Sequence, residues 1–74
     1  MFGGDGLVNT LKLKGRIREL NLTQEDCAKA LNIQTPTFSQ KINNLRPFSL
    51  SQAEALAKFL HIPDDRFGVY FFYS

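Results

Sequence analysis

The stretch that decides the fold is Thr23-Gln24-Glu25-Asp26-Cys27-Ala28-Lys29-Ala30-Leu31-Asn32. Thr23 is a good N-cap and Asp26 stands at the third helical position, so the opening resembles a capping box with Asp in place of the usual Glu or Gln. Asn32 follows where a helix needs a residue in the left-handed conformation, for which Asn is the best choice after Gly. The pattern predicts a short helix over residues 24–31.

A second short helix is predicted three residues further on, over residues 36–43. Thr35 can cap it, and Pro36 then occupies the first helical position, where its missing N–H is no loss. Phe38 and Ile42 are four residues apart and would form its buried side. Two short helices joined in this way, the second amphipathic, are typical of a helix-turn-helix, although an ordinary helical hairpin with a solvated polar face would show the same pattern.

A helix is also expected before this pair, with Asn9 or Thr10 as its cap. Three apolar residues follow at helical spacing and would share one face: Leu13, Ile17 and Leu20. The same stretch alternates strictly between apolar and basic residues, which is also the period of a half-buried strand. The local pattern favours the helix and leaves the strand open.

After the pair, Ser49, or Ser51 with Glu54 as its capping partner, opens a fourth helix that reaches about residue 60. One more short turn is expected before residue 67. The two ends differ from the domain between them. Residues 1–8 are glycine-rich and without a period, and are expected to be a disordered lead or a cloning remnant. Residues 68–74 form an aromatic tail, which either folds back onto the core or contacts a partner.

The composition describes one small domain of 74 residues with a formal charge of +2. A chain this short buries a single thin core, which disfavours a deep catalytic cleft. The one cysteine, Cys27, has no partner for an internal disulfide, and together with the one histidine, His61, it cannot form a structural zinc site. We therefore expect no metal and no cofactor, and with so thin a core we expect no enzyme. No apolar run approaches the roughly 20 residues of a membrane span, so we expect a cytoplasmic protein.

The positive charge is unevenly placed along the chain. One stretch is purely basic: Lys12, Lys14, Arg16 and Arg18. A solvated face is the commoner explanation of such a stretch, and a nucleic-acid partner is the alternative.

Several fragments together resemble the Cro/C1-type (XRE) helix-turn-helix family of phage repressors over about residues 11–67. They are Leu22 to Ile33, Thr37-Phe38-Ser39, Lys41-Ile42-Asn43-Asn44 and Ser49-Leu50 leading to Leu56-Ala57-Lys58-Phe59-Leu60-His61-Ile62. The resemblance implies an all-α, compact four- to five-helix lambda-repressor-like DNA-binding domain over residues 9–67, with the first segment helical. It further implies a transcriptional regulator of a bacterial host that binds a double-stranded DNA operator as a homodimer, with a recognition helix over about residues 35–43.

The same resemblance implies roles for individual residues. Base reading falls to Thr35, Thr37 and Gln40. Phosphate contacts fall to five others: Gln24, Lys41, Asn43, Asn44 and Arg46. Pro36 stands where several relatives carry a polar base reader, and Cys27 stands where the family has a core leucine, so we expect a buried, inert thiol there.

Two other classes of function are weighed against this one. Small phage proteins of this fold could act by binding a partner repressor rather than DNA, and the aromatic tail and the low net charge agree with that reading. A hydrolase or transferase is the least favoured, because His61 would be the only imidazole available to it.

Overall fold

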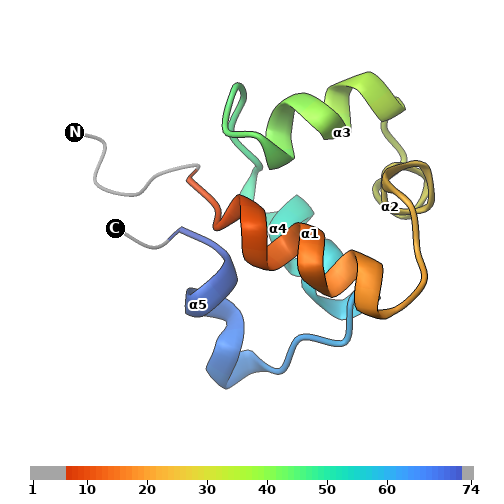
Figure 1. Cartoon of the computed structure of the whole chain (residues 1–74). Helices are drawn as coiled ribbons and strands as arrows, with labels where there is room; N and C mark the ends of the chain where they lie inside the picture. The colour runs from red at the N-terminus through yellow and green to blue at the C-terminus, as the bar shows by residue number, and fades with distance from the viewer. Residues whose placement is uncertain (1–6, 73–74) are drawn as a thin grey trace.

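The computed structural model describes residues 7–72, which fold into a single all-helical unit. Its elements are α1 (Thr10–Glu19), α2 (Gln24–Leu31), α3 (Thr35–Ile42), α4 (Leu50–Phe59), a 3-10 turn η1 (Asp64–Arg66) and α5 (Phe67–Tyr70). Figure 1 shows α1 across the middle of the molecule, with α3 on one side and α5 on the other. The prediction of an all-α domain is confirmed, and the first segment is a helix rather than a strand.

Side-chain caps determine where three of these helices begin. The side chain of Asn9 accepts an N–H bond from the first turn of α1. Thr23 and Asp26 form the predicted capping box of α2, with the Thr23 hydroxyl accepting from the Asp26 N–H at 3.1 Å. Ser49 and Gln52 form a second capping box at α4, so the alternative that used Ser51 and Glu54 is wrong.

The start of α3 also differs from the prediction. The helix begins at Thr35, one residue earlier than expected, and Gln34 is its N-cap without a side-chain hydrogen bond. Pro36 consequently occupies the second helical position, where its missing N–H is again no loss. Thr35 is therefore part of the helix rather than its cap.

The first four helices end in the same way. Each is followed by a residue with a left-handed backbone, with φ from 57° to 63°: Asn21, Asn32, Asn44 and His61. The next N–H then donates to the carbonyl five residues before it, at 2.8–3.0 Å, as in a Schellman motif. In three of the four motifs this next residue, Leu22, Ile33 or Ile62, packs on the core, whereas Leu45 after α3 is 74% exposed.

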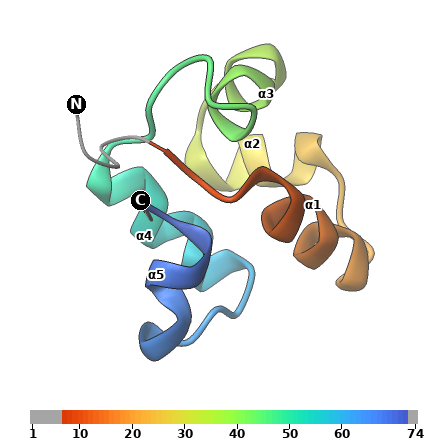
Figure 2. The same cartoon turned by 60° about the vertical axis from the view of Figure 1, so that its left-hand side comes forward.

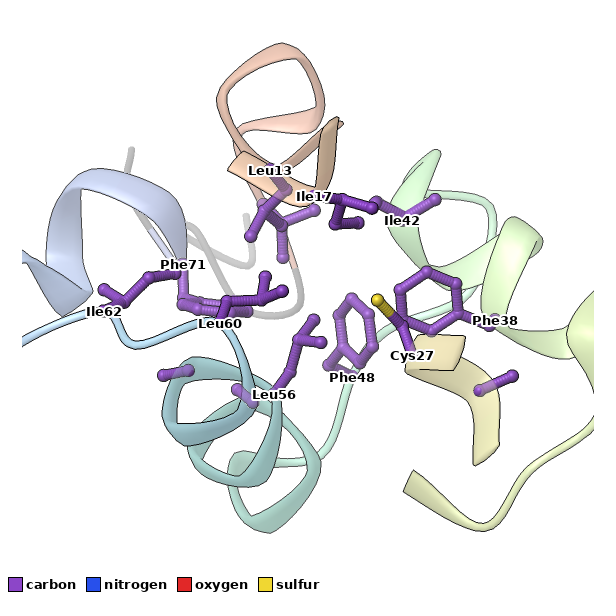
Figure 3. Packing of buried hydrophobic residues seen from close by; sticks show 14 residues of the cluster. Leu13, Ile17, Cys27, Phe38, Ile42, Phe48, Leu56, Leu60, Ile62 and Phe71 are labelled. Atoms are coloured by element: carbon purple, nitrogen blue, oxygen red, sulfur yellow. The ribbon is translucent and has the colours of Figure 1, made fainter. Parts of the chain in front are cut away.

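One cluster of apolar side chains joins all the helices (Figure 3). Leu13 of α1 and Leu56 of α4 are fully buried within it. An aromatic row crosses the cluster, in which Phe48 makes edge-to-face contacts with Phe38 at 5.9 Å and with Phe71 at 6.3 Å between ring centroids. Such ring pairs stabilise the folded protein beyond the effect of burying the rings. The row links Phe38 of α3 to Phe71, which follows α5.

The two ends of the described chain lie side by side (Figure 2). Val8 is fully buried and forms an antiparallel β-bridge with Phe71, and the Asn9 N–H donates to the Tyr70 carbonyl at 2.8 Å. The predicted disordered lead is therefore wrong for Val8, while residues 1–6 lie outside the described residues. The predicted boundary between residues 67 and 68 falls inside α5, and Phe71 folds back into the core, which was one of the two expectations for the tail. Residues 73–74 lie outside the described residues.

The helices of residues 7–72 are short. The longest have 10 residues, and none is long and apolar enough to cross a membrane. This part of the chain also holds no group of three His, Cys, Asp or Glu side chains that could bind a metal ion.

Candidate nucleic-acid interface

α3 has one buried and one exposed side. Phe38 and Ile42 are fully buried against the core. Because successive helical residues are rotated by about 100°, Pro36, Gln40 and Asn43 point in the opposite direction, and all three are exposed. This side carries amide groups and no carboxylate, and amides can both donate to and accept from the edges of bases.

The three expected base readers occupy different positions on this helix. Gln40 lies at the centre of the exposed side, opposite Phe38 and Ile42. Thr35 is exposed at the first residue of α3, and Thr37 is half-buried on one flank. Gln40 and Thr35 are therefore exposed to solvent, and Thr37 is half-buried.

Three of the five expected phosphate contacts, Gln24, Asn43 and Arg46, lie on the segments around α3. Gln24 is half-buried at the first residue of α2, where the N–H groups have no acceptor within the helix and suit an anion. Asn43 is exposed at the end of α3, and its side-chain amide donates to the Ser39 carbonyl at 2.8 Å. Arg46 is exposed in the loop that follows.

The other two expected phosphate contacts, half-buried Lys41 and exposed Asn44, make hydrogen bonds to other segments of the chain. The Lys41 Nζ donates to the Pro47 carbonyl at 2.9 Å and to the Gln52 Oε1 at 3.0 Å, and so ties α3 to the start of α4. The Asn44 Oδ1 accepts from the Val8 N–H at 2.8 Å, and its Nδ2 donates to the Val8 carbonyl at 3.0 Å. These bonds brace the loop after α3, and the phosphate contacts expected of Lys41 and Asn44 stay predictions.

One residue near α3 was missed by sequence reasoning. The Lys14 Nζ of α1 donates to the Asn43 Oδ1 at 3.1 Å, which places a cation beside the exposed end of α3. The signal was present in the basic stretch of residues 12–18, but the sequence does not say which of its cations faces α3.

Cys27 lies in the core beneath α2 and takes no part in the exposed surface. Burial, and to a smaller extent the charge of Asp26, raises the pKa of its thiol from 9.0 to about 11. The thiol is therefore protonated at neutral pH, and the expectation of a buried side chain is confirmed.

Comparisons of the chain with models of protein families, with curated proteins and with solved structures found no match. The exposed surface around α3 combines a short helix with exposed polar groups, the capped first turn of α2 with Gln24, and cations from the neighbouring segments.

Proposed function

We propose that this chain binds double-stranded DNA in a sequence-specific manner as a phage- or prophage-type transcriptional regulator of the Cro/C1 kind. In this proposal α2 and α3 form the helix-turn-helix, and α3 lies in the major groove. The observation that carries it is the two-sided character of α3, with Phe38 and Ile42 anchored in the core and Gln40 exposed on the far side. The major groove admits an α-helix and presents a distinct donor and acceptor pattern for each base pair.

The surrounding residues suit the positioning of α3 on the duplex. Gln24, Asn43 and Arg46 would contact backbone phosphates, which set register without reading sequence. Thr35 and Thr37 would assist Gln40 at the base edges. Two copies of the chain would read half-sites about one helical turn apart, since dimeric proteins of this kind bind two-fold sites.

A second candidate function is binding to a partner repressor protein. The observation in its favour is Leu45, which is 74% exposed although the corresponding residues after α1, α2 and α4 pack on the core. Leu50 is 59% exposed only five residues later. Exposed apolar surface of this kind is a common feature of protein interaction sites.

Selection of bound duplexes from a random-sequence pool, at about physiological salt where non-specific binding is weak, tests the two candidates. DNA recognition by α3 should enrich a palindrome with half-sites about 10 base pairs apart. Gln40→Ala should alter the enriched sequence at one position of each half-site, whereas Glu54→Ala, exposed on α4, should leave it unchanged. If the folded protein enriches no duplex sequence, the DNA proposal is wrong and binding to a partner repressor remains the candidate function.

A further inference from the structure

The basic stretch of α1 is divided by the helix into two pairs. Because each residue is rotated by about 100°, Lys12 and Arg16 lie on one flank of the buried stripe, and Lys14 and Arg18 lie on the other. Arg16 is engaged inside the protein, since its Nε donates to the Leu60 carbonyl at 2.9 Å. The second pair has a different environment.

Lys14 and Arg18 border a cleft between α1 and the start of α2. The cleft has a volume of about 340 Å³ and six lining residues: Lys14, Ile17, Arg18, Leu22, Thr23 and Gln24. Ile17 is almost fully buried at its base. The two cations are four residues apart on one helix face, so their Cβ atoms are about 5–6 Å from each other and their charges repel.

The carboxylates on the neighbouring helix segments are already paired. Glu19 pairs with Arg16 at 3.3 Å, and Glu25 pairs with Lys29 at 3.7 Å. Asp26 accepts the Thr23 N–H at 2.8 Å. Within residues 7–72, by contrast, neither cation of the cleft has a carboxylate partner, so the cleft keeps an uncompensated positive charge.

We infer that Lys14 and Arg18, together with Gln24, form a binding site for a phosphodiester group of the DNA backbone. The inference rests on the proposed function and deepens it. The hydrogen bond from Lys14 to Asn43 fixes this cleft relative to the end of α3, so the bound phosphate would belong to the backbone beside the groove that α3 enters. The Arg18 guanidinium can bind two phosphate oxygens at once, and Lys14 adds a second charge.

The test is the salt dependence of binding to a duplex of mixed sequence. For B-DNA, the slope of log affinity against log salt concentration is about −0.9 per neutralised phosphate. Lys14→Gln with Arg18→Gln should therefore make this slope shallower by about 0.9. The matched control is Lys58→Gln with Arg66→Gln, which removes the same charge from exposed positions on α4 and η1 and should leave the slope unchanged.

Neutral methylphosphonate groups, introduced one at a time along the duplex, give a second readout. At one phosphate of the duplex, the neutral group should weaken binding of the wild-type protein but not of the double variant, because the double variant has already lost the contact with that phosphate. If the double variant loses its thermal transition, the single variants are measured instead, and each should still flatten the slope.

The outcomes separate the two levels of the proposal. If the wild-type protein binds DNA and the double variant has the same salt-dependence slope as the control variant, the cleft is not a phosphate site. The proposal that α3 binds DNA then still stands. A folded wild-type protein that binds no duplex overturns both.

Discussion

Asn44 combines two features that few residues could supply together. Its backbone is left-handed, with φ of 63°, and its side-chain amide bonds both the N–H and the carbonyl of Val8. Asn44→Ala should lower the free energy of unfolding by about 2–4 kcal/mol, since it loses two hydrogen bonds and strains the backbone. Asn44→Gly keeps the backbone freedom, so it should cost only about 1–3 kcal/mol in urea denaturation.

The same pair of variants checks the internal role of Asn44. The slope of DNA affinity against salt should be the same for Asn44→Gly as for the wild-type protein, because no phosphate contact is removed. A shallower slope with unchanged stability would support Asn44 as a phosphate ligand.

Gln40 and Arg46 should differ in how their loss affects DNA binding. Gln40→Ala should cost about 1–3 kcal/mol on the best selected site and relax specificity at one base position. Arg46→Ala should weaken binding to all duplexes about equally and flatten the salt dependence. Titrations of both variants against the selected site and a scrambled duplex measure this; an equal loss on both duplexes for Gln40→Ala would contradict a base-reading role.

The Cys27 thiol makes stability depend on alkaline pH. Its folded-state pKa of about 11 exceeds the ordinary value of 9.0, so between these values the unfolded chain binds fewer protons than the folded one. The contribution of the protonated Cys27 thiol to the free energy of unfolding is complete below about pH 9 and is lost as pH rises through about 11. In urea denaturation the wild-type protein should therefore lose more stability than Cys27→Ala between about pH 8 and pH 10.5.

Reactivity supplies an independent check on the same residue. The thiolate is the nucleophile, so a thiol reagent at neutral pH should modify the protein only after denaturant is added. Rapid modification of the native protein would contradict the burial of Cys27.

At the scale of whole elements, α1 is held against the end of α4 by Arg16. Its guanidinium donates to the carbonyls of Leu60 and His61, where the last groups of α4 lack helical partners. Arg16→Met should lower the free energy of unfolding by about 1.5–3 kcal/mol, as expected for hydrogen bonds from a charged donor. Arg18→Met, two residues later and exposed, should change it by less than about 0.5 kcal/mol.

Chemical denaturation of the two variants measures the difference. It also separates stability from binding, because Arg18→Met should reduce the salt dependence of DNA affinity while leaving the fold intact. If both variants lower the free energy of unfolding equally, Arg16 does not stabilise the fold more than the exposed Arg18 does.

The ends of the helices show how far local sequence determines an element. The capping box of Thr23 and Asp26 and the left-handed Asn32 were predicted correctly, because each depends on atoms within one helical turn. The start of α3 was misplaced by one residue, since Gln34 caps it without any side-chain bond that a pattern could reveal. At α4 both Ser49 and Ser51 can cap a helix, and only the packed structure selects between them.

At the scale of the molecule, the two ends of the described residues, at Val8 and Phe71, complete the core. Phe71 is 1% exposed, stacks on Phe67 at 4.8 Å between ring centroids and contacts Phe48. Phe71→Ala should lower the free energy of unfolding by about 3–5 kcal/mol, which is a large part of the stability of so small a domain. Val69→Ala is the matched control, because Val69 is 37% exposed and should have little effect.

Thermal unfolding followed by circular dichroism distinguishes the two variants. A Phe71→Ala protein with the wild-type transition would show that the C-terminal residues do not stabilise the domain, and would return the aromatic tail to the role of a partner contact.

The sequence by itself determined α2, α3 and α4 and the sides on which they are buried, whereas the pattern of α1 also allowed a strand and α5 was not predicted. Caps, left-handed asparagines and the spacing of Phe38 and Ile42 act between residues that are close along the chain, so they can be recognised without the fold. The polar exposed side of α3, with Gln40 at its centre, follows from the same spacing.

Only the tertiary structure decided which polar groups remain at the surface. Asn44 bonds Val8 across 36 positions of the chain, and Arg16 bonds Leu60 across 44. These partners meet because the helices fold back around a shared core, and nothing local marks them. For the same physical reason, the sequence could place cations on α1 but could not tell that Arg16 is engaged internally while Lys14 and Arg18 line an open cleft.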